Sequence, residues 1–340
     1  MKPDLASFHI QGKEVSGLLS QLAEGRLVHA SLITGEKGTG KRTLAKLIAS
    51  ALLCSSGGDR PCGICRDCIL AEQGEHPDVT VIRQGVPLAP DGKKDRTTIP
   101  VDDIREMIRI CGSHTLEGKA RVVLLFDAER MTAQAQNSLL KTLEEPPENT
   151  YIILVTGHPE ALLTTVISRC RPIRLKAWPD EYVLNVLAEE GIRGKRAEEC
   201  VEEAHGSIGR ALELASDEEY WKTRAEVNSL FFRPAGTGRS DILRVSNSWK
   251  ERKAEAGTLL NILETSLDRM AHCRYRGKGS SEEAGLPDNW KRFSEKAGPE
   301  DFTGLINAVS DARKQLESNV NFQAVLEQLL FVFMGEGNKW

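Results

Sequence analysis

Ten residues, 34–43 (TGEKGTGKRT), have the composition and spacing of a loop that binds phosphate. The glycines allow the backbone to curl so that several N–H groups face phosphate oxygens, and Lys41 adds a mobile positive charge. These glycines are Gly35, Gly38 and Gly40. Because an apolar run precedes the loop and a helical pattern follows it, we favour a site for ATP or ADP over an ordinary glycine turn.

The loop lacks one residue that magnesium chemistry requires. The position after the lysine is normally Ser or Thr, whose hydroxyl binds Mg²⁺, and here it is Arg42. An arginine side chain has only hydrogen-bond donors and carries a positive charge, so it cannot ligate a cation. Thr43 comes one residue later, rotated by about 100° around the helix, and is a poor substitute. The magnesium site is therefore degraded.

A second place in the sequence also lacks a residue that magnesium chemistry requires. Asp127 follows the apolar run RVVLLF, where a carboxylate could hold a metal ion through water, although Asp is also a common helix N-cap there. Hydrolysing ATPases of this kind place a glutamate next, to polarise the attacking water, and here the residue is Ala128. Glu129 is displaced by one position. Because residues for magnesium chemistry are missing at two separate places, we expect this chain's own ATPase activity to be weak or absent.

Four cysteines lie within a short segment with the spacing C-x7-C-x2-C-x2-C; they are Cys54, Cys62, Cys65 and Cys68. Four thiolates suit a tetrahedral zinc ion, and a site with no open ligand position is structural rather than catalytic. Ferredoxins share the tight C-x2-C-x2-C run but continue with x3-C-P, which is absent here. Iron–sulfur binding and free thiols remain as alternatives. His76 precedes Pro77 and leads into the next strand, so we do not count it as a ligand.

The elements that position these residues alternate between strands and helices. Short apolar runs predict strands at 30–34, 79–82, 121–127, 151–156 and 172–175. Helical spacing of apolar residues follows the loop and recurs after Pro100 and around 138–143. This alternation predicts an α/β domain with a parallel sheet covered by helices on both faces. Beyond Trp178 the pattern becomes helical, beginning with a helix at 181–187.

The composition limits the class of protein. The chain has 340 residues, of which 40% are hydrophobic and 28% are charged, as in a folded globular protein. Its net charge of −4 argues against a broadly basic nucleic-acid binder. No run reaches the roughly 18 apolar residues of a membrane span, and the N-terminus lacks the apolar core of a signal peptide. We therefore expect a cytoplasmic protein that does not associate with a membrane.

Several motifs occur together in a diagnostic order: GEKGTGKRTLA, the four-cysteine insert, HPDV, NSLLKTLEEPPENTYIILVT and VISRC. In combination they resemble the AAA+ clamp-loader subunits of bacterial DNA polymerase III. The resemblance is strong over 27–175 and continues more weakly through GSIGRAL and NVNFQAVLEQLL. Two types of subunit in this family carry the insert and the SRC motif. The motor type (gamma/tau) has an intact magnesium site, whereas the delta-prime type commonly does not, so Arg42 and Ala128 favour delta-prime.

The resemblance implies a division into three domains. Residues 1–177 would form an AAA+ P-loop domain with a zinc module near 54–68. Residues 178–232 would form a small helical lid domain, and 233–340 an all-α collar domain for oligomerisation. The apolar stripe of the last helix could equally belong to the internal core of that domain.

The resemblance also assigns roles to single residues. Arg169, between Ser168 and Cys170, would be an arginine finger that reaches the γ-phosphate of ATP on an adjacent motor subunit. Without the family context, Arg169 would be interpreted as an ordinary solvent-exposed arginine. Thr156 matches the position that senses the γ-phosphate, while Arg210 is shifted from the second sensing position and is left out of the site. The segment 144–147 (EEPP) is interpreted as a structural helix stop.

These features predict a non-hydrolysing subunit of a hetero-oligomeric clamp-loader ring. Its expected partners are the motor and delta subunits and, through the complex, the sliding clamp and primer-template DNA. The alternative is an ATP-hydrolysing motor subunit of the gamma/tau type, in which Thr43 or water replaces the missing ligand. A stand-alone zinc and DNA-binding protein is a third interpretation, against which the net charge argues.

Overall fold

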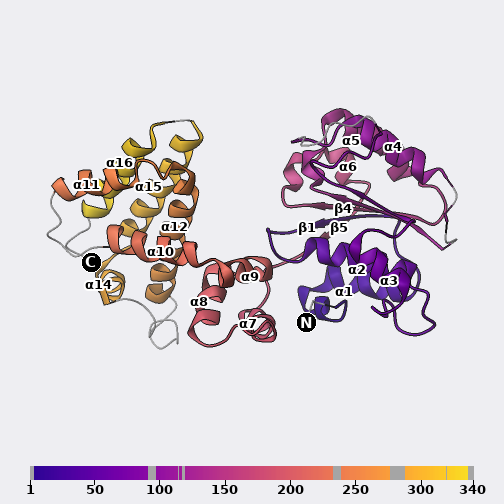
Figure 1. Ribbon diagram of the computed structural model, residues 1–340, viewed down its shortest axis with the longest axis horizontal. Coiled ribbons are helices and arrows are strands. Elements are labelled where there is room, and N and C mark those ends of the chain that lie inside the picture. Colours follow the sequence, from indigo (N-terminus) through magenta and orange to yellow (C-terminus); the bar gives the residue numbers. More distant parts are fainter. Residues whose placement is uncertain are drawn as a thin grey trace. The chain divides into compact units, whose positions relative to one another are not determined.

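The structure is a computed structural model of the chain, and it describes residues 4–90, 97–113, 115–116, 119–232, 239–275, 288–318 and 320–335. The chain divides into two compact units, Met1–Ala215 and Ser216–Trp340 (Figure 1). The three-domain division at 177/178 and 232/233 stays a prediction, and the second of these boundaries adjoins residues 233–238, which lie outside the described residues.

The first unit is built on a five-stranded sheet in the order β2-β3-β4-β1-β5. All pairings between these strands are parallel. The strands are β1 Ala30–Thr34, β2 Val79–Ile82, β3 Arg121–Phe126, β4 Thr150–Thr156 and β5 Arg171–Arg174. The predicted parallel sheet is therefore confirmed, with strand bounds that differ by at most one residue. Because the strands are parallel, the residues that follow β1, β3 and β4 share one edge of the sheet.

Helices cover both faces of this sheet (Figure 1). One face carries α1 Lys13–Ala23, α2 Lys41–Leu53 and α3 Arg66–Gln73; the other carries α4 Val101–Cys111, α5 Ala133–Glu144 and α6 Thr164–Ile167. The strands are apolar on both sides because both sides are covered, and all six residues of β3 are buried. Pro100 is the N-cap of α4 and so lies just before its first turn rather than within it.

The same unit continues into three short helices, α7 Asp180–Glu189, α8 Lys195–Ala204 and α9 Ile208–Ser216. The helix expected at 181–187 is thus present, with one residue more at its amino end and two more at its carboxyl end. Trp178 is buried just before α7, where its ring stacks on Tyr182 and meets the edge of Phe8. These aromatic contacts join the N-terminal segment to the start of the helical part.

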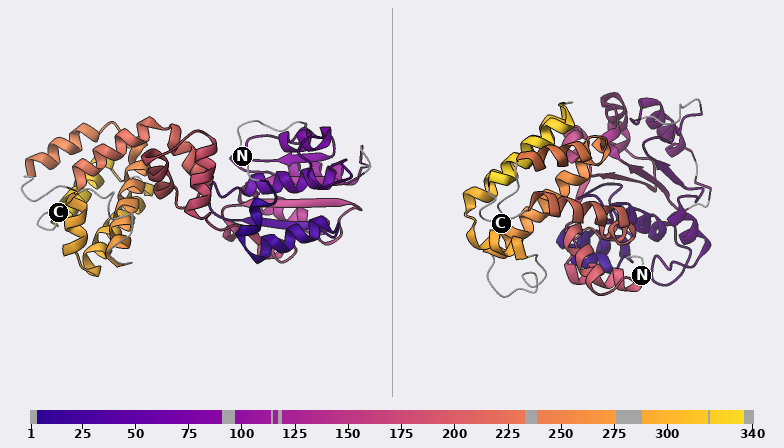
Figure 2. Two further views of the ribbon diagram at one scale, coloured as in Figure 1. Left: turned by 90° about the horizontal axis from the view of Figure 1, so that it is seen from below. Right: turned by 60° about the vertical axis from the view of Figure 1, so that its left-hand side comes forward.

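The described part of the second unit consists of helices alone, which Figure 2 shows from two further directions. They are α10 Glu218–Phe231, α11 Arg239–Trp249, α12 Ala256–Tyr275, α14 Asp288–Lys296, α15 Pro299–Glu317 and α16 Phe322–Gly335. The apolar stripe predicted for the last helix is buried within this unit, and Phe333 packs edge-on against Phe231 and Phe232. Among the described residues, no helix is long and apolar enough to cross a membrane.

Candidate functional site

The glycine-rich loop predicted to bind phosphate connects β1 to α2, as the sequence predicts. Gly35, Gly38 and Gly40 have φ angles of 146°, 80° and 90°, which residues with a side chain rarely adopt. At Gly35 a Cβ atom would also come within 2.7 Å of the carbonyl oxygen of Leu175. The loop leads into the first turn of α2, whose backbone N–H groups have no acceptor within the helix and are available to an anion.

The start of α9 packs directly on this loop. The backbone N–H of Gly209 donates to the carbonyl of Gly38 at 3.0 Å, and the Ser207 hydroxyl donates to the carbonyl of Lys37 at 2.9 Å. The indole N–H of Trp178 donates to the carbonyl of Thr39 at 2.9 Å. This contact requires a glycine at position 38, since a Cβ there would overlap the Ser207 hydroxyl.

Lys41 turns back along the loop. Its ammonium group donates to the carbonyls of Gly35 and Glu36, at 2.8 and 2.6 Å. Burial lowers the pKa of Lys41, and the carboxylate of Glu129 acts in the opposite direction. An ammonium group has three N–H donors, so this arrangement leaves one for a phosphate oxygen.

Arg42 is paired with Asp127. Its Nη2 atom donates to both carboxylate oxygens of Asp127, at 2.7 and 2.8 Å, and its guanidinium lies 5.3 Å from the ring centre of Phe126. Asp127 adopts a left-handed conformation with φ of 55°, which ends β3 one residue before the predicted end. It occupies the N-cap position of a short 3-10 helix, Ala128–Arg130, but its side chain makes no capping bond there. The carboxylate is thus committed to Arg42.

The two residues after Asp127 point in different directions. Ala128 is fully buried in the core. Glu129 accepts a hydrogen bond from the hydroxyl of Thr156 at 2.6 Å, and the same hydroxyl accepts one from the backbone N–H of His158 at 2.9 Å. Thr156 ends β4 and is buried beside β1, directly opposite Thr34 in the register. Thr43 is half-buried in the first turn of α2.

The SRC segment follows α6. Cys170 is buried in the hydrophobic core, and burial raises the pKa of its thiol to about 12, so its role is packing. The Ser168 hydroxyl donates to the carbonyl of Thr165 at 3.2 Å. These contacts hold the loop on both sides of Arg169. The Arg169 side chain is about one third exposed and bonds to Glu144 and to the Thr165 carbonyl.

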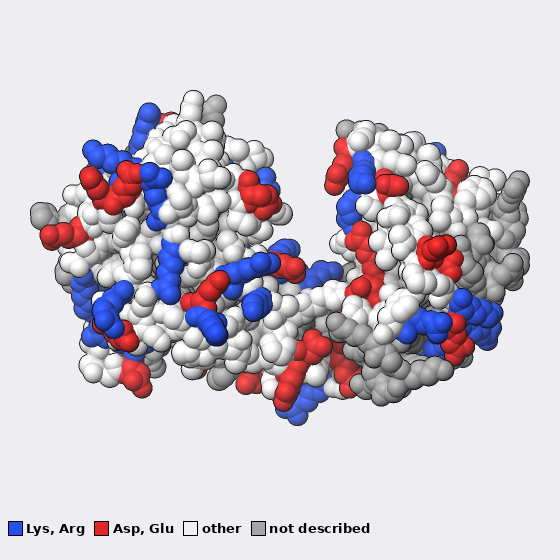
Figure 3. Space-filling model, turned by 180° about the vertical axis from the view of Figure 1, so that it is seen from behind, with Lys and Arg blue, Asp and Glu red and all other residues white. Residues whose placement is uncertain are grey.

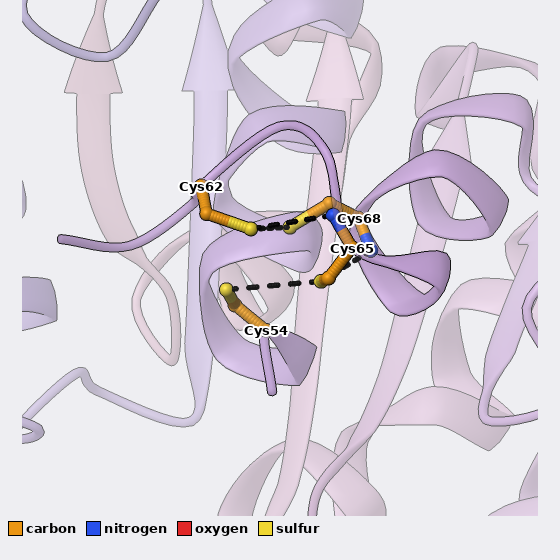
Figure 4. Close-up of side chains that lie close together, drawn as sticks. All are labelled: Cys54, Cys62, Cys65 and Cys68. Atoms are coloured by element: carbon orange, nitrogen blue, oxygen red, sulfur yellow. Dashed lines mark hydrogen bonds between the residues drawn. The ribbon is translucent and has the colours of Figure 1, made fainter. Parts of the chain in front are cut away.

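The four clustered cysteines converge on one point (Figure 4). Their sulfurs lie within 4.8 Å of one another, with 4.0 Å between Cys54 and Cys65 and between Cys62 and Cys68. These separations are about twice a disulfide bond length of roughly 2.05 Å. Four sulfurs at about 2.3 Å from one tetrahedral ion would be about 3.8 Å apart. The donor set therefore fits a single metal ion bound by four thiolates.

Backbone hydrogen bonds lower the pKa of Cys62 and Cys65 and so favour their thiolates, whereas burial raises the pKa of Cys68. Backbone N–H groups of Cys65 and Cys68 donate to the sulfurs of Cys62 and Cys65, both at 3.4 Å. The hydrogen bond from the Cys68 N–H lowers the pKa of Cys65 to about 5. Lys119 donates to the Leu53 carbonyl at 2.9 Å and to Asp67 at 3.0 Å, which ties together the two segments that carry the cysteines. The Nδ1 atom of His76 accepts a hydrogen bond from the Asp78 N–H. The exclusion of His76 from the ligands stays a prediction.

Comparison with known proteins adds the family. A sequence model described as "DNA polymerase III, delta subunit" matches residues 10–179, half of the chain. The delta-prime subunit of DNA polymerase III from Escherichia coli is 30% identical over 317 residues, which is 92% of this chain and 91% of that protein. The chain belongs to the clamp-loader subunits of bacterial DNA polymerase III.

Within this clamp-loader family the chain is most like the delta-prime type. The Bacillus subtilis delta-prime subunit is 28% identical over 326 residues, with 95% of this chain and 96% of that protein covered. The Escherichia coli tau subunit is 33% identical over 207 residues, but this match covers 59% of this chain and 30% of tau. The similarity to delta-prime thus extends through the second unit, whereas the similarity to tau does not span the whole chain.

The structure brings the predicted nucleotide-site residues together, and it places Arg169 and the cysteine cluster elsewhere. The loop glycines, Lys41, Arg42, Asp127 and Thr156 gather at the carboxyl edge of the sheet, while Arg169 lies beyond α6 with Glu144. Sequence reasoning missed two partners, Asp127 as the partner of Arg42 and Glu144 as the partner of Arg169. The only signal for Glu144 was its place in the EEPP segment, which was interpreted as a helix stop.

Proposed function

We propose that this chain is a non-hydrolysing subunit of the clamp loader of DNA polymerase III, and that it lends Arg169 to the ATP site of a neighbouring motor subunit. Its membership of the delta-prime type supports the place in the complex. The observation that most strongly supports the absence of hydrolysis is the ion pair between Arg42 and Asp127 in the chain's own phosphate site.

The ion pair supports the loss of hydrolysis because it removes both metal contacts at once. A magnesium ion needs the hydroxyl after the lysine and the carboxylate at the end of the neighbouring strand. Arg42 replaces the hydroxyl, and its guanidinium binds both oxygens of Asp127. A fixed positive charge at this point also repels a divalent cation. ATP or ADP can still meet the loop N–H groups and Lys41, but without a magnesium ion to offset charge on the phosphates.

The water-activating residue is the second missing part. Ala128 has no group that can accept a proton, and the carboxylate of Glu129 is engaged by Thr156. We therefore assign Thr156 and Glu129 to the structure of this edge of the sheet rather than to chemistry on a bound nucleotide.

Arg169 supports the role toward a neighbour. A guanidinium delivered by one subunit to another offsets the charge that builds on the phosphoryl oxygens, and its planar fork suits this task better than an ammonium group. Arg169 is held at the surface by a loop whose next residue, Cys170, is anchored in the core. Such a site delivers the charge outward and keeps its backbone still.

The cysteine cluster would hold one structural zinc ion. Four thiolates and no open position exclude a role for the ion as a Lewis acid on a substrate. The ion would keep α3 and the end of α2 together. Elemental analysis of purified protein should find one zinc per chain, and thermal stability should fall after chelation. A metal-free preparation with four reactive thiols and unchanged stability would contradict the site.

The expected partners are motor subunits of the gamma/tau type and a delta subunit, with the sliding clamp and primer-template DNA reached through the complex. The test mixes the chain with these subunits and measures ATP turnover. We expect ATPase activity that depends on DNA and clamp only when all are present. Purified chain that alone turns over ATP with magnesium, and loses this activity on Lys41→Ala, would instead establish the second candidate.

That second candidate is a motor subunit of the gamma/tau type, which the retained Lys41 and the similarity to tau favour. A stand-alone DNA-binding protein has less support. On the face seen in Figure 3, Lys and Arg side chains are interspersed with Asp and Glu. Tight, salt-sensitive binding of duplex DNA by the isolated chain would revive it.

A further inference from the structure

Glu144 stands at the end of α5, where the chain fixes its position closely. Thr132 caps the start of the helix, and its hydroxyl accepts a hydrogen bond from the Ala135 N–H at 3.2 Å. It ends after Glu144, because Glu145 leaves the helical conformation and Pro146 and Pro147 follow. The EEPP segment is therefore a helix stop, as predicted, and in addition it places a carboxylate at a defined point.

The carboxylate of Glu144 binds Arg169, 25 residues later in the chain. A single oxygen, Oε1, accepts from Nε at 2.6 Å and also from Nη2. The third contact of the guanidinium runs from Nη1 to the Thr165 carbonyl at 2.9 Å. Of the five N–H donors of an arginine, these contacts use three and leave one on each terminal nitrogen.

Helix α5 also fixes the segment at Ala161 and Leu163, which leads into the SRC loop. Gln136 is buried in α5, and its side-chain oxygen accepts from the Leu163 N–H at 2.7 Å. Its side-chain nitrogen donates to the carbonyls of Met131 and Ala161, both at 3.3 Å. Helix α5 thus anchors the loop at its start through Gln136 and orients the arginine at its end through Glu144.

We propose that Glu144 is a positioning residue for Arg169, which holds the guanidinium in one orientation with its two remaining donors available to a phosphate of the neighbouring subunit. The proposal rests on the proposed function of Arg169. A long, exposed side chain samples many rotamers, and transition-state stabilisation requires one of them. Glu144 is about half exposed, so it restrains the arginine without removing it from reach of a partner.

The experiment uses the reconstituted clamp loader and measures kcat and KM for ATP with DNA and clamp. Glu144→Ala should lower kcat by about 10- to 100-fold, the scale of a misplaced catalytic group, and leave KM nearly unchanged because the neighbour binds the nucleotide. Glu144→Gln should restore most of kcat. One amide oxygen can replace the single oxygen that accepts both N–H donors, although the charge is lost.

Matched variants separate this proposal from others. Glu145→Ala removes the adjacent exposed carboxylate and should behave as the wild type. Arg169→Ala with Glu144→Ala should be no slower than Arg169→Ala alone, because Glu144 acts through the arginine. Melting temperatures and size-exclusion profiles of the complexes serve to show that each variant folds and assembles.

The outcomes distinguish the proposed function of Arg169 from the positioning role of Glu144. If Arg169→Ala leaves kcat unchanged, the proposed function itself fails. If Arg169→Ala lowers kcat and Glu144→Ala does not, only the positioning role fails. A higher kcat in Glu144→Ala would overturn the proposal in favour of a carboxylate that competes with phosphate for the arginine, and a Glu144→Gln variant as slow as Glu144→Ala would overturn the geometric explanation.

Discussion

Two arginines of this chain are each paired with a carboxylate from a distant part of the sequence, and the pairs have different consequences. Arg42 bonds to both oxygens of Asp127 beside the chain's own phosphate loop. Arg169 bonds to one oxygen of Glu144 at a surface loop after α6. In the first pair the carboxylate is the group that a metal ion would need, and the arginine engages both of its oxygens. In the second pair, as we propose, the carboxylate positions the arginine, whose two remaining donors stay available to another molecule.

This difference shows that the pairing of an arginine with a carboxylate does not by itself indicate a function. The chemistry is a guanidinium on a carboxylate in both regions, with the arginine side chain 55% exposed in the first pair and 32% exposed in the second. The functional difference that we propose follows from the place of each pair in the fold. The edge of the sheet presents Arg42 to the chain's own loop, whereas the SRC loop presents Arg169 to the exterior.

The largest expected effect tests the second pair. Arg169→Ala should lower ATP turnover of the reconstituted complex at the neighbouring site by about 10³-fold or more, the scale of arginine fingers. Arg109 serves as a control, because it is exposed and also pairs through Nε and Nη2 with a glutamate, in this case with both carboxylate oxygens of Glu106. Steady-state ATPase assays with DNA and clamp measure both. If Arg169→Ala and Arg109→Ala changed ATP turnover to the same extent, Arg169 would act no differently from an ordinary surface arginine.

An intermediate effect tests the first pair. Arg42→Thr supplies the hydroxyl that a magnesium ion requires and frees Asp127, so magnesium should tighten ATP binding by about tenfold, or about 1.4 kcal/mol. Calorimetric titrations with and without Mg²⁺ measure this change. Arg42→Ala is the control, since it removes the cation and adds no hydroxyl. If both variants respond to magnesium alike, the hydroxyl is not what the wild type lacks.

The smallest effect concerns stability. Asp127→Asn should lower the free energy of unfolding by only about 0.2–1 kcal/mol, because the pair with Arg42 is partly exposed and screened by solvent. A double-mutant cycle with Arg42→Ala, followed by urea denaturation, measures the coupling. The coupling should shrink at high salt. A coupling energy well above this range would mean that the Arg42–Asp127 pair mainly stabilises the fold. The pair could then no longer be compared with the Arg169 pair as a feature of a functional site.

Much of the first unit could be predicted because its signals are local. Apolar runs such as RVVLLF are long enough to predict buried strands, and their alternation with helices predicts a parallel sheet. The cysteine spacing predicted a cluster, and the four sulfurs do converge. The absence of a magnesium ligand at Arg42 was likewise evident from the residue type.

The partners of the two arginines could not be predicted in the same way. Arg42 and Asp127 are 85 residues apart, and Arg169 and Glu144 are 25 apart, so no spacing rule relates the members of either pair. Asp127 was considered as a helix cap, and the helix position is correct, but the side chain turns to Arg42 instead. A charged donor nearby offers a stronger bond than a backbone N–H, which explains the choice.

The sequence by itself determined which chemical groups this protein has: a glycine loop with a lysine, no hydroxyl for magnesium, four clustered thiols and an SRC motif. Those properties follow from residue type and short-range spacing. Only the tertiary structure decided which carboxylate meets which arginine, because the sheet brings β1, β3 and β4 together at one edge and the end of α5 beside the SRC loop. Side-chain partners depend on such long-range packing, and no local pattern records them.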